Sequence, residues 1–201
     1  MQLTTTRLQA QIQFIVEIDK LKHVFRQTLL MDKSRRENDA EHSWHLAMMA
    51  IVLSEYADSQ VNLLRVLKMV LIHDLVEIDA GDTFCYDAIA LQDQSDREQK
   101  AADRLFGMLP ENIGEELRTL WEEFEAKETL DAQFAAALDR LQPLLHNYYT
   151  QGGTWKMANV TEAQVRKRMA PVSICSPVLG EFVDSLIEDA IRQGFILKSE
   201  L

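Results

Sequence analysis

The chain has 201 residues, a length typical of one domain, and 47% of them are apolar, enough for a substantial core. Its formal net charge of −11 disfavours nucleic acid as a partner, because an acidic surface repels phosphate backbones. The only cysteines, Cys85 and Cys175, exclude a disulfide framework, and we expect reduced thiols in a cytoplasmic protein. Charged residues occur within the first twenty residues, and His73 and Asp74 interrupt the most apolar run, 69–76, so we expect no secretory leader and no membrane contact.

Apolar spacing and turn residues predict helices in succession along the chain and no strand. The predicted helices cover residues 8–31, 39–56, 61–80, 95–109, 114–126 and 129–149, followed by one that begins at 161 and one over 176–194. Residues 82–94 are predicted to form a loop after a helix stop at Gly81. The helix starts rest on three signals, namely capping-box pairs at Ser95/Glu98 and Thr161/Gln164 and the Ser176-Pro177 dipeptide. We therefore predict an all-α fold, a single-domain helical bundle.

One apolar helix segment carries an ionisable pair, His73-Asp74. Burying a lone carboxylate is costly unless another group compensates its charge. Three more acids follow within eight residues of Asp74, while no Lys or Arg occurs between Lys68 and Arg97. A bound cation is the simplest compensation for such a cluster, so the pattern favours a metal site over a structural role.

Two further groups of residues fit this interpretation. His42 and His45 are three positions apart on a predicted helix, and Asp139 lies within an apolar helical frame. Pro143 removes the helical hydrogen bond to the carbonyl of Asp139 and predicts a local distortion there. For His45, as for His23 and His146, we favour an ordinary structural role, because a single histidine on a helix is more often a hydrogen-bonded residue than a ligand.

The order Glu41-His42, His73-Asp74 and Asp139, each in a predicted helix, resembles the HD-domain superfamily of metal-dependent phosphohydrolases. The segments from Arg36 to Ser43 and from His73 to Asp82 are similar to its 5′-deoxynucleotidase branch. The resemblance covers about residues 21–149 and implies one HD domain over 1–201, with helices of 161–197 packed on that core. It also implies a homodimer that acts on a small nucleotide.

The resemblance also implies roles for individual residues. It assigns His42, His73, Asp74 and Asp139 as ligands of a divalent metal, which could be Mn, Co, Fe, Zn, Ni or Mg. It assigns Glu77 and Asp82 to catalysis, or together with Thr83 to a second metal ion. Arg26 would orient the substrate phosphate beside Gln27, where bacterial relatives carry a Trp that helps to reject the ribose 2′-hydroxyl. Selectivity for deoxyribose is therefore not implied here.

We hypothesise that Glu77 orients or deprotonates the attacking water and that Asp82 protonates the leaving oxygen or holds a second cation. Glu41 could support the imidazole of His42 or simply stabilise a helix N-terminus. Arg35 and Arg36 are expected to pair with nearby acids rather than with substrate.

Other functions stay open at this point. The substrate could be a cyclic nucleotide, a deoxynucleoside triphosphate or guanosine tetraphosphate. Two further alternatives are a di-iron oxygenase that recruits additional histidines and a metal-stabilised helical module without turnover.

Overall fold

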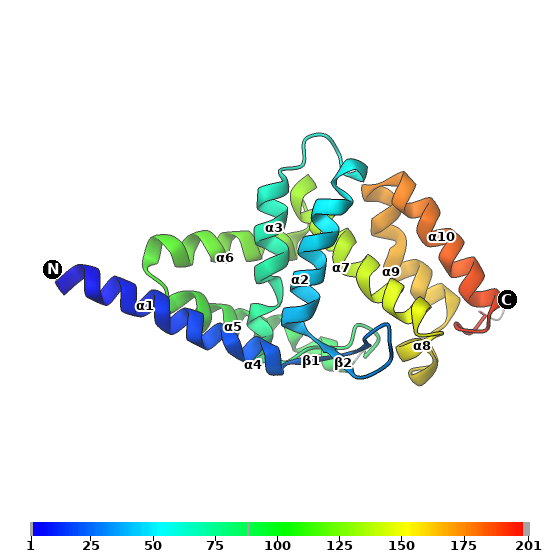
Figure 1. The fold of residues 1–201 in the computed structure, drawn as a ribbon, viewed down its shortest axis with the longest axis horizontal. Coiled ribbons are helices and arrows are strands. Elements are labelled where there is room, and N and C mark those ends of the chain that lie inside the picture. Colours follow the sequence, from blue (N-terminus) through cyan, green and yellow to red (C-terminus); the bar gives the residue numbers. More distant parts are fainter. Residues whose placement is uncertain (1, 88, 199–201) are drawn as a thin grey trace.

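The computed structural model describes residues 2–87 and 89–198, and for residues 2–5 the backbone alone. Long helices dominate these residues, as predicted, and a small antiparallel hairpin accompanies them (Figure 1). The helices and strands are α1 (Gln2–Ile18), β1 (Phe25–Leu29), β2 (Arg36–Asn38), α2 (Asp39–Val52), α3 (Leu63–Ile72), α4 (Glu77–Ala80), α5 (Gln94–Gly107), α6 (Glu111–Ala126), α7 (Leu130–Tyr149), α8 (Gly153–Met157), α9 (Glu162–Cys175) and α10 (Pro177–Arg192). Short 3₁₀ turns cover Asp19–His23, Ser54–Tyr56, His73–Val76 and Ala90–Gln92.

The helix α7 is the centre of the molecule and packs against α2, α3, α6 and α9 (Figure 1). Its residues from 134 to 138, an apolar run, are all buried, and they join one continuous core with side chains from the surrounding helices. The helix runs through Pro143 without interruption. This central position places Asp139, near the middle of α7, beside His42 of α2 and His73 of the 3₁₀ turn that follows α3.

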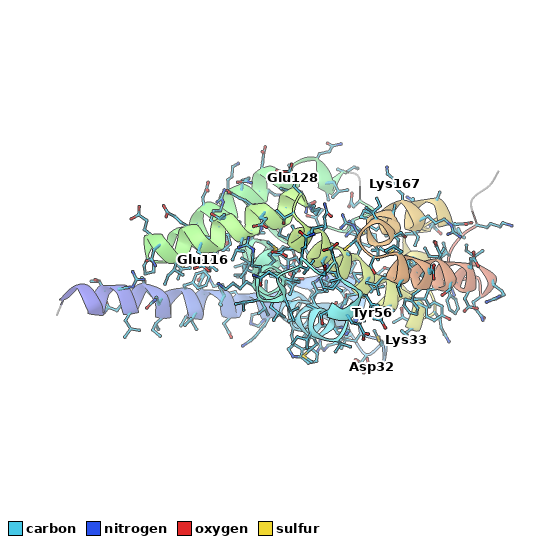
Figure 2. The ribbon with its side chains drawn as sticks, turned by 90° about the horizontal axis from the view of Figure 1, so that it is seen from above. Asp32, Lys33, Tyr56, Glu116, Glu128 and Lys167 are labelled. Carbon is cyan, nitrogen blue, oxygen red and sulfur yellow. The ribbon has the colours of Figure 1, made fainter. Side chains whose placement is uncertain are left out.

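The hairpin contradicts our prediction of a helix over 8–31 and of a strand-free chain. The first helix ends at Ile18, and β1 then pairs with β2, with Phe25 opposite Asn38 and Leu29 opposite Arg36. The turn is closed by Lys33, whose φ is 64°, and by Asp32, whose carboxylate accepts hydrogen bonds from Ser34. Figure 2 shows Asp32 and Lys33 at the outer edge of the molecule, as expected for a polar hairpin tip.

The predicted helix over 61–80 is divided into three pieces. α3 ends at Ile72, a 3₁₀ turn follows over His73–Val76, and α4 ends at Ala80. The next residue, Gly81, has a φ of 75°, which confirms the predicted stop. Because a 3₁₀ turn has three residues per turn rather than 3.6, it changes which side chains share a face. His73 and Glu77 are four residues apart, but they do not lie in one continuous α-helix, so the i, i+4 rule for a shared face does not apply to them.

Local capping signals gave mixed results. The Thr161/Gln164 capping box is confirmed, and so is Ser176, whose hydroxyl accepts from the amide of Leu179 ahead of Pro177. The predicted Ser95/Glu98 box is wrong, because α5 begins at Gln94 and its capping residue makes no side-chain cap. That residue, Asp93, instead accepts a hydrogen bond from Arg97.

Two absences apply to the described part of the chain. None of its helices has both the length and the apolar composition that crossing a membrane requires. Cys85 and Cys175 are both free thiols, which agrees with the expected lack of a disulfide.

Candidate metal centre and substrate cleft

Four side chains that the sequence singled out converge at the junction of α2, α3 and α7. His42 Nε2 lies 3.1 Å from Asp139 Oδ1 and 3.8 Å from Asp74 Oδ2. His73 Nε2 lies 3.0 Å from Asp74 Oδ1 and 3.8 Å from Asp139 Oδ1. The four come from three elements and from positions nearly one hundred residues apart, so only the tertiary fold brings them together.

Hydrogen bonding fixes the orientation of His73. Its Nδ1 lies 3.0 Å from the carbonyl oxygen of Val70, to which it can only donate. In the neutral ring, Nε2 therefore carries the lone pair, and this atom is buried with no hydrogen-bond partner. A buried imidazole nitrogen that makes no hydrogen bond and lies 3.0 and 3.8 Å from two carboxylates is arranged as a metal ligand would be.

The pKa values of the two histidines are shifted in opposite directions. Burial opposes a charge on His73, but the carboxylates of Asp74 and Asp139 outweigh it and raise its pKa to about 9. For His42, burial followed by the nearby charge of Arg26 lowers the pKa to about 4. Burial alone would raise the pKa of Asp139, yet its contacts with His42 and His73 hold it well below the ordinary value. A proton on His73 thus compensates the carboxylates, a role that a metal cation would take over.

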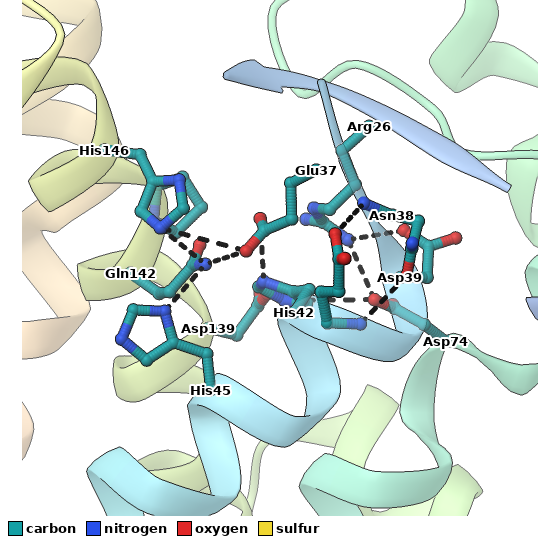
Figure 3. A network of polar contacts seen from close by, with 12 residues as sticks. Arg26, Glu37, Asn38, Asp39, His42, His45, Asp74, Asp139, Gln142 and His146 are labelled. Atoms are coloured by element: carbon teal, nitrogen blue, oxygen red, sulfur yellow. Dashed lines mark hydrogen bonds and ion pairs between the residues drawn. The ribbon is translucent and has the colours of Figure 1, made fainter. Parts of the chain in front are cut away.

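Arg26, on β1, does not face open solvent. Its Nη1 donates to Asp74 Oδ2 at 2.8 Å and to Asp39 Oδ1 at 3.3 Å, and it lies 3.9 Å from Asp82 Oδ1 (Figure 3). The side chain is only 13% exposed. The guanidinium therefore compensates the acids around the centre, and Arg26 also lines a cleft next to it.

A second group of acids lies next to this centre. Ligand atoms of Asp39, Glu77 and Asp82 lie within 4.8 Å of one another, and Asp39 and Glu77 are buried. Burial, and then the charge of Asp74, raises the pKa of Asp39 to about 7 and that of Glu77 well above its ordinary value. Burial also raises the pKa of Asp82. The structure thus adds Asp39 to the expected pair of Glu77 and Asp82.

Thr83 has a different partner. Its hydroxyl accepts a hydrogen bond from Arg97 of α5 at 3.1 Å. The same guanidinium donates to the backbone carbonyls of Ala80 and Ala90. Arg97 therefore holds both ends of the loop that carries Asp82.

Most side chains of the centre and of the second group of acids line a cleft, which residues from the C-terminal half of the chain complete. Arg140 and Arg168, which we did not predict as site residues, line it, and Arg168 Nη2 lies 3.9 Å from Asp139 Oδ2. Burial and then the neighbouring charge of Arg168 lower the pKa of Arg140, so positive charge is crowded at this wall. The available signal was the basic run 166–168 in an acidic chain. Other lining residues include Gln27, His73, Asp74, Glu77, Asp82, Thr83, Phe84, Tyr86, Trp155 and Met169.

The acid beside His42 is Glu37, not Glu41. Glu41 accepts from the amide of Asn38 in a capping box and pairs with Arg35 at 2.8 Å, as expected for a helix acid and a basic turn. Glu37 is 1% exposed, and its Oε2 lies 3.8 Å from His42 Nδ1. On its other side Glu37 meets His45 and His146, two histidines for which we expected no shared site. Glu37 gave no sequence signal of its own, because it lies in the polar segment between the predicted helices over 8–31 and 39–56.

The sequence pattern of the HD domain matches residues 18–175, which include every residue of the centre. The chain belongs to the HD domain family. A crystal structure described as a predicted metal-dependent phosphohydrolase from Magnetospirillum magnetotacticum MS-1 is 57% identical, covers 96% of both chains and superimposes with a TM-score of 0.92. A conserved hypothetical protein from Pyrococcus furiosus, 22% identical over 90% of this chain and 99% of its own, shares the fold with a TM-score of 0.64.

Curated relatives carry a more specific name. The human 5′-deoxynucleotidase HDDC2 is 31% identical over 135 residues, which are 67% of this chain and 65% of that protein. The Bos taurus protein of the same name is 30% identical, over 67% of this chain and 64% of its own length. The chain thus spans just under two thirds of the length of these relatives.

Proposed function

We propose that this HD domain protein is a metal-dependent phosphomonoester hydrolase that converts nucleoside 5′-monophosphates, with or without a 2′-hydroxyl, to nucleoside and phosphate. The observation that carries this proposal is the convergence of His42, His73, Asp74 and Asp139 beside a cleft with arginines on its walls. The names of the relatives support the substrate class.

The four side chains suit a divalent ion. They offer two imidazole nitrogens and two carboxylates, a mixed donor set compatible with Mn, Co, Fe, Zn, Ni or Mg. The unpaired Nε2 of His73 is an observation that a ligand would explain. A bound ion would supply Lewis-acid charge to the phosphoryl group and favour ionisation of water near neutral pH.

The neighbouring acids can move the protons of the reaction. Glu77 is 8% exposed and lines the cleft beside His73, where it could accept the proton of an attacking water. An added cation would lower the raised pKa of Glu77 and so free it to act as a base. Asp82, whose pKa is raised by burial, can hold the proton that the leaving 5′-oxygen requires. Asp39, Glu77 and Asp82 together could instead hold a second cation.

Arginines would hold the phosphate. Arg26 borders the cleft with a guanidinium already fixed by Asp74 and Asp39, so it is preorganised. Arg140 and Arg168, which also line the cleft, add two positive charges. Phe84, Tyr86 and Trp155 give the same cleft an apolar side, which suits a nucleobase.

A phosphate-release assay tests the proposal. The chelated protein is reloaded with Mn²⁺ or Co²⁺ and incubated with matched ribo- and deoxyribonucleoside 5′-monophosphates. We expect inorganic phosphate with metal and none with excess chelator. Release of pyrophosphate from triphosphates instead would reassign the substrate, and an inactive metal-loaded protein across the panel would refute hydrolysis.

We also propose that the whole chain acts as one HD domain in a cytoplasmic homodimer without nucleic-acid or membrane partners. The apolar side chains of Trp44, Met48, Ile51 and Val52 lie exposed along α2 and offer a face for a second copy. Light scattering after gel filtration tests this. Trp44→Glu should give monomers, and a wild-type protein that is already monomeric would contradict the dimer.

A further inference from the structure

A second cluster of potential ligands lies behind His42, away from the cleft. It consists of Glu37 from β2, His45 from α2, and Gln142 and His146 from α7, and Figure 3 shows the four side chains pointing toward one another. One donor atom each from Glu37, His45 and His146 lies within 4.8 Å of the others. We call this group the Glu37 cluster. Its four residues are not among the described residues that line the cleft.

The orientation of His146 leaves a lone pair in the cluster. Its Nδ1 lies 2.8 Å from the carbonyl oxygen of Leu29 and donates to it. In the neutral ring, Nε2 is then an acceptor, and it lies 3.8 Å from Glu37 Oε1. Burial lowers the pKa of His146 and also that of His45, so both rings favour the neutral form that binds metals.

The amide nitrogen of Gln142 occupies the middle of the cluster. It lies 2.6 Å from Glu37 Oε1, 3.0 Å from His146 Nε2 and 3.4 Å from His45 Nδ1. An amide nitrogen has two hydrogens, and Glu37 Oε1 and His146 Nε2 are its two nearer acceptors. When the neutral His45 ring carries its lone pair on Nδ1, the amide has no hydrogen left for it, and the site then contains more lone pairs than donors.

The remaining atoms increase this deficit. Gln142 Oε1 and Glu37 Oε2 are both buried without a hydrogen-bond partner, and the two side chains are 0% and 1% exposed. With Glu37 ionised, turning the amide over would satisfy neither, because it would place an oxygen against the Glu37 carboxylate. Buried acceptors without donors are rare in proteins, and a cation removes the deficit in one step.

We propose that the Glu37 cluster binds a divalent transition-metal ion through Glu37 Oε1, His45 Nδ1 and His146 Nε2. The ion would displace the Gln142 nitrogen, and a half-turn of that amide would present Oε1 as a fourth ligand. Ligand atoms at tetrahedral angles around Zn²⁺ lie roughly 3.4 Å apart, so the observed 3.8 Å between Glu37 and His146 needs little adjustment. His45 is only half-buried and gives the ion a route in.

Such an ion would affect the first centre by holding the carboxylate of Glu37 in place. Glu37 presents Oε1 to the cluster and Oε2 to His42 Nδ1, so one carboxylate connects the two sites. Fixing this carboxylate would hold the ring of His42, as second-shell acids do at other metal sites. The same ion would join the hairpin to α2 and α7. We therefore regard Glu37, His45 and His146 as positioning residues.

Metal content and thermal stability test the proposal without reference to hydrolysis. Untagged protein is saturated with Co²⁺, freed of excess ion and analysed for cobalt per chain. His45→Ala and His146→Ala should each lose about one cobalt relative to wild type, and the control His23→Ala should lose none. Because His45 makes only one of the polar contacts of the cluster, its variant should fold even if the His146 variant does not.

The Asp74→Ala background separates this site from the first centre. In that variant Co²⁺ should still bind and raise the melting temperature, and adding His45→Ala should remove about one further cobalt per chain and reduce the rise in melting temperature. If His45→Ala holds as much cobalt as wild type, or if Asp74→Ala and the double variant respond equally to Co²⁺, the proposal is overturned. Neither result depends on whether the protein hydrolyses nucleotides.

Discussion

The raised pKa of His73 predicts that the metal-free protein loses stability at alkaline pH. The folded-state pKa of about 9 exceeds the ordinary value of 6.5, so the native state binds the proton more tightly than the unfolded chain does. The resulting stabilisation is complete below pH 6.5 and is lost as the pH rises through 9. Between pH 7 and pH 9.5 the loss is about 2 kcal/mol.

Urea unfolding of chelated protein at several pH values measures this loss. The free energy of unfolding should fall by about that amount in wild type and much less in His73→Gln, while His23→Gln should follow wild type. Glu37 and Asp39, whose pKa values are raised to about 7, lose their own contribution mainly below this window. Saturating Mn²⁺ should flatten the dependence, because a bound ion requires the neutral ring. Equal slopes for wild type and His73→Gln would refute the assignment of the proton to His73.

Three further predictions concern the proposed hydrolysis. Asp74→Ala should lose the ion of the first centre and all turnover, and metal-dependent activity in this variant would exclude the assigned ligands. Glu77→Gln should keep its metal by elemental analysis while kcat falls by roughly 10²–10⁴, whereas normal turnover would remove Glu77 as the base. Arg168→Ala should raise KM for nucleotides about tenfold, the effect of losing one charged contact. Its matched control is Arg166→Ala, which removes an arginine paired with Glu162, and equal effects of the two would argue against a substrate contact by Arg168.

The sequence predicted the features that depend on local chemistry. The stop at Gly81, the capping box of Thr161 and the Ser176-Pro177 start are each decided by a few neighbouring residues, and the structure has all three. The Ser95/Glu98 pattern failed because Gln94 and Arg97 bind the acids of that segment. A capping side chain can bind other side chains instead of the helix amides, and the sequence alone does not indicate which of these partners lies nearby.

The hairpin could not be predicted from spacing alone. The apolar positions before residue 25 follow a helical period, but β1 is stabilised by pairing with β2 across a turn and by contacts with α7 and α8. Such contacts join distant residues and override local propensity. The same limit hid Asp39 and Glu37, which flank Asn38 in a polar segment and become buried only when the hairpin meets α2.

The candidate ligands were accessible to prediction for a different reason. A single acid in an apolar helical segment is unusual enough to be noticed in the sequence. The structure brings Asp74 and Asp139 close to His42 and His73. That these four bind metal stays a prediction, as do the roles of Glu77, Asp82 and Arg26. Arg168 was hidden because nothing in its neighbourhood along the chain indicates that α9 reaches the cleft.

The hydrogen bonds that Arg97 makes to Ala80 and Ala90 let one short segment both hold Asp82 in place and line the cleft. One guanidinium fixes the backbone at Ala80 and Ala90, so the chain between these anchors can change its side chains without displacing Asp82. Phe84 and Tyr86 lie in that span and border the space where a base would sit. Substitutions at these positions would alter which nucleobase is accepted and leave Asp82 in place. The nucleobase preference would then diverge among relatives faster than the hydrolytic reaction.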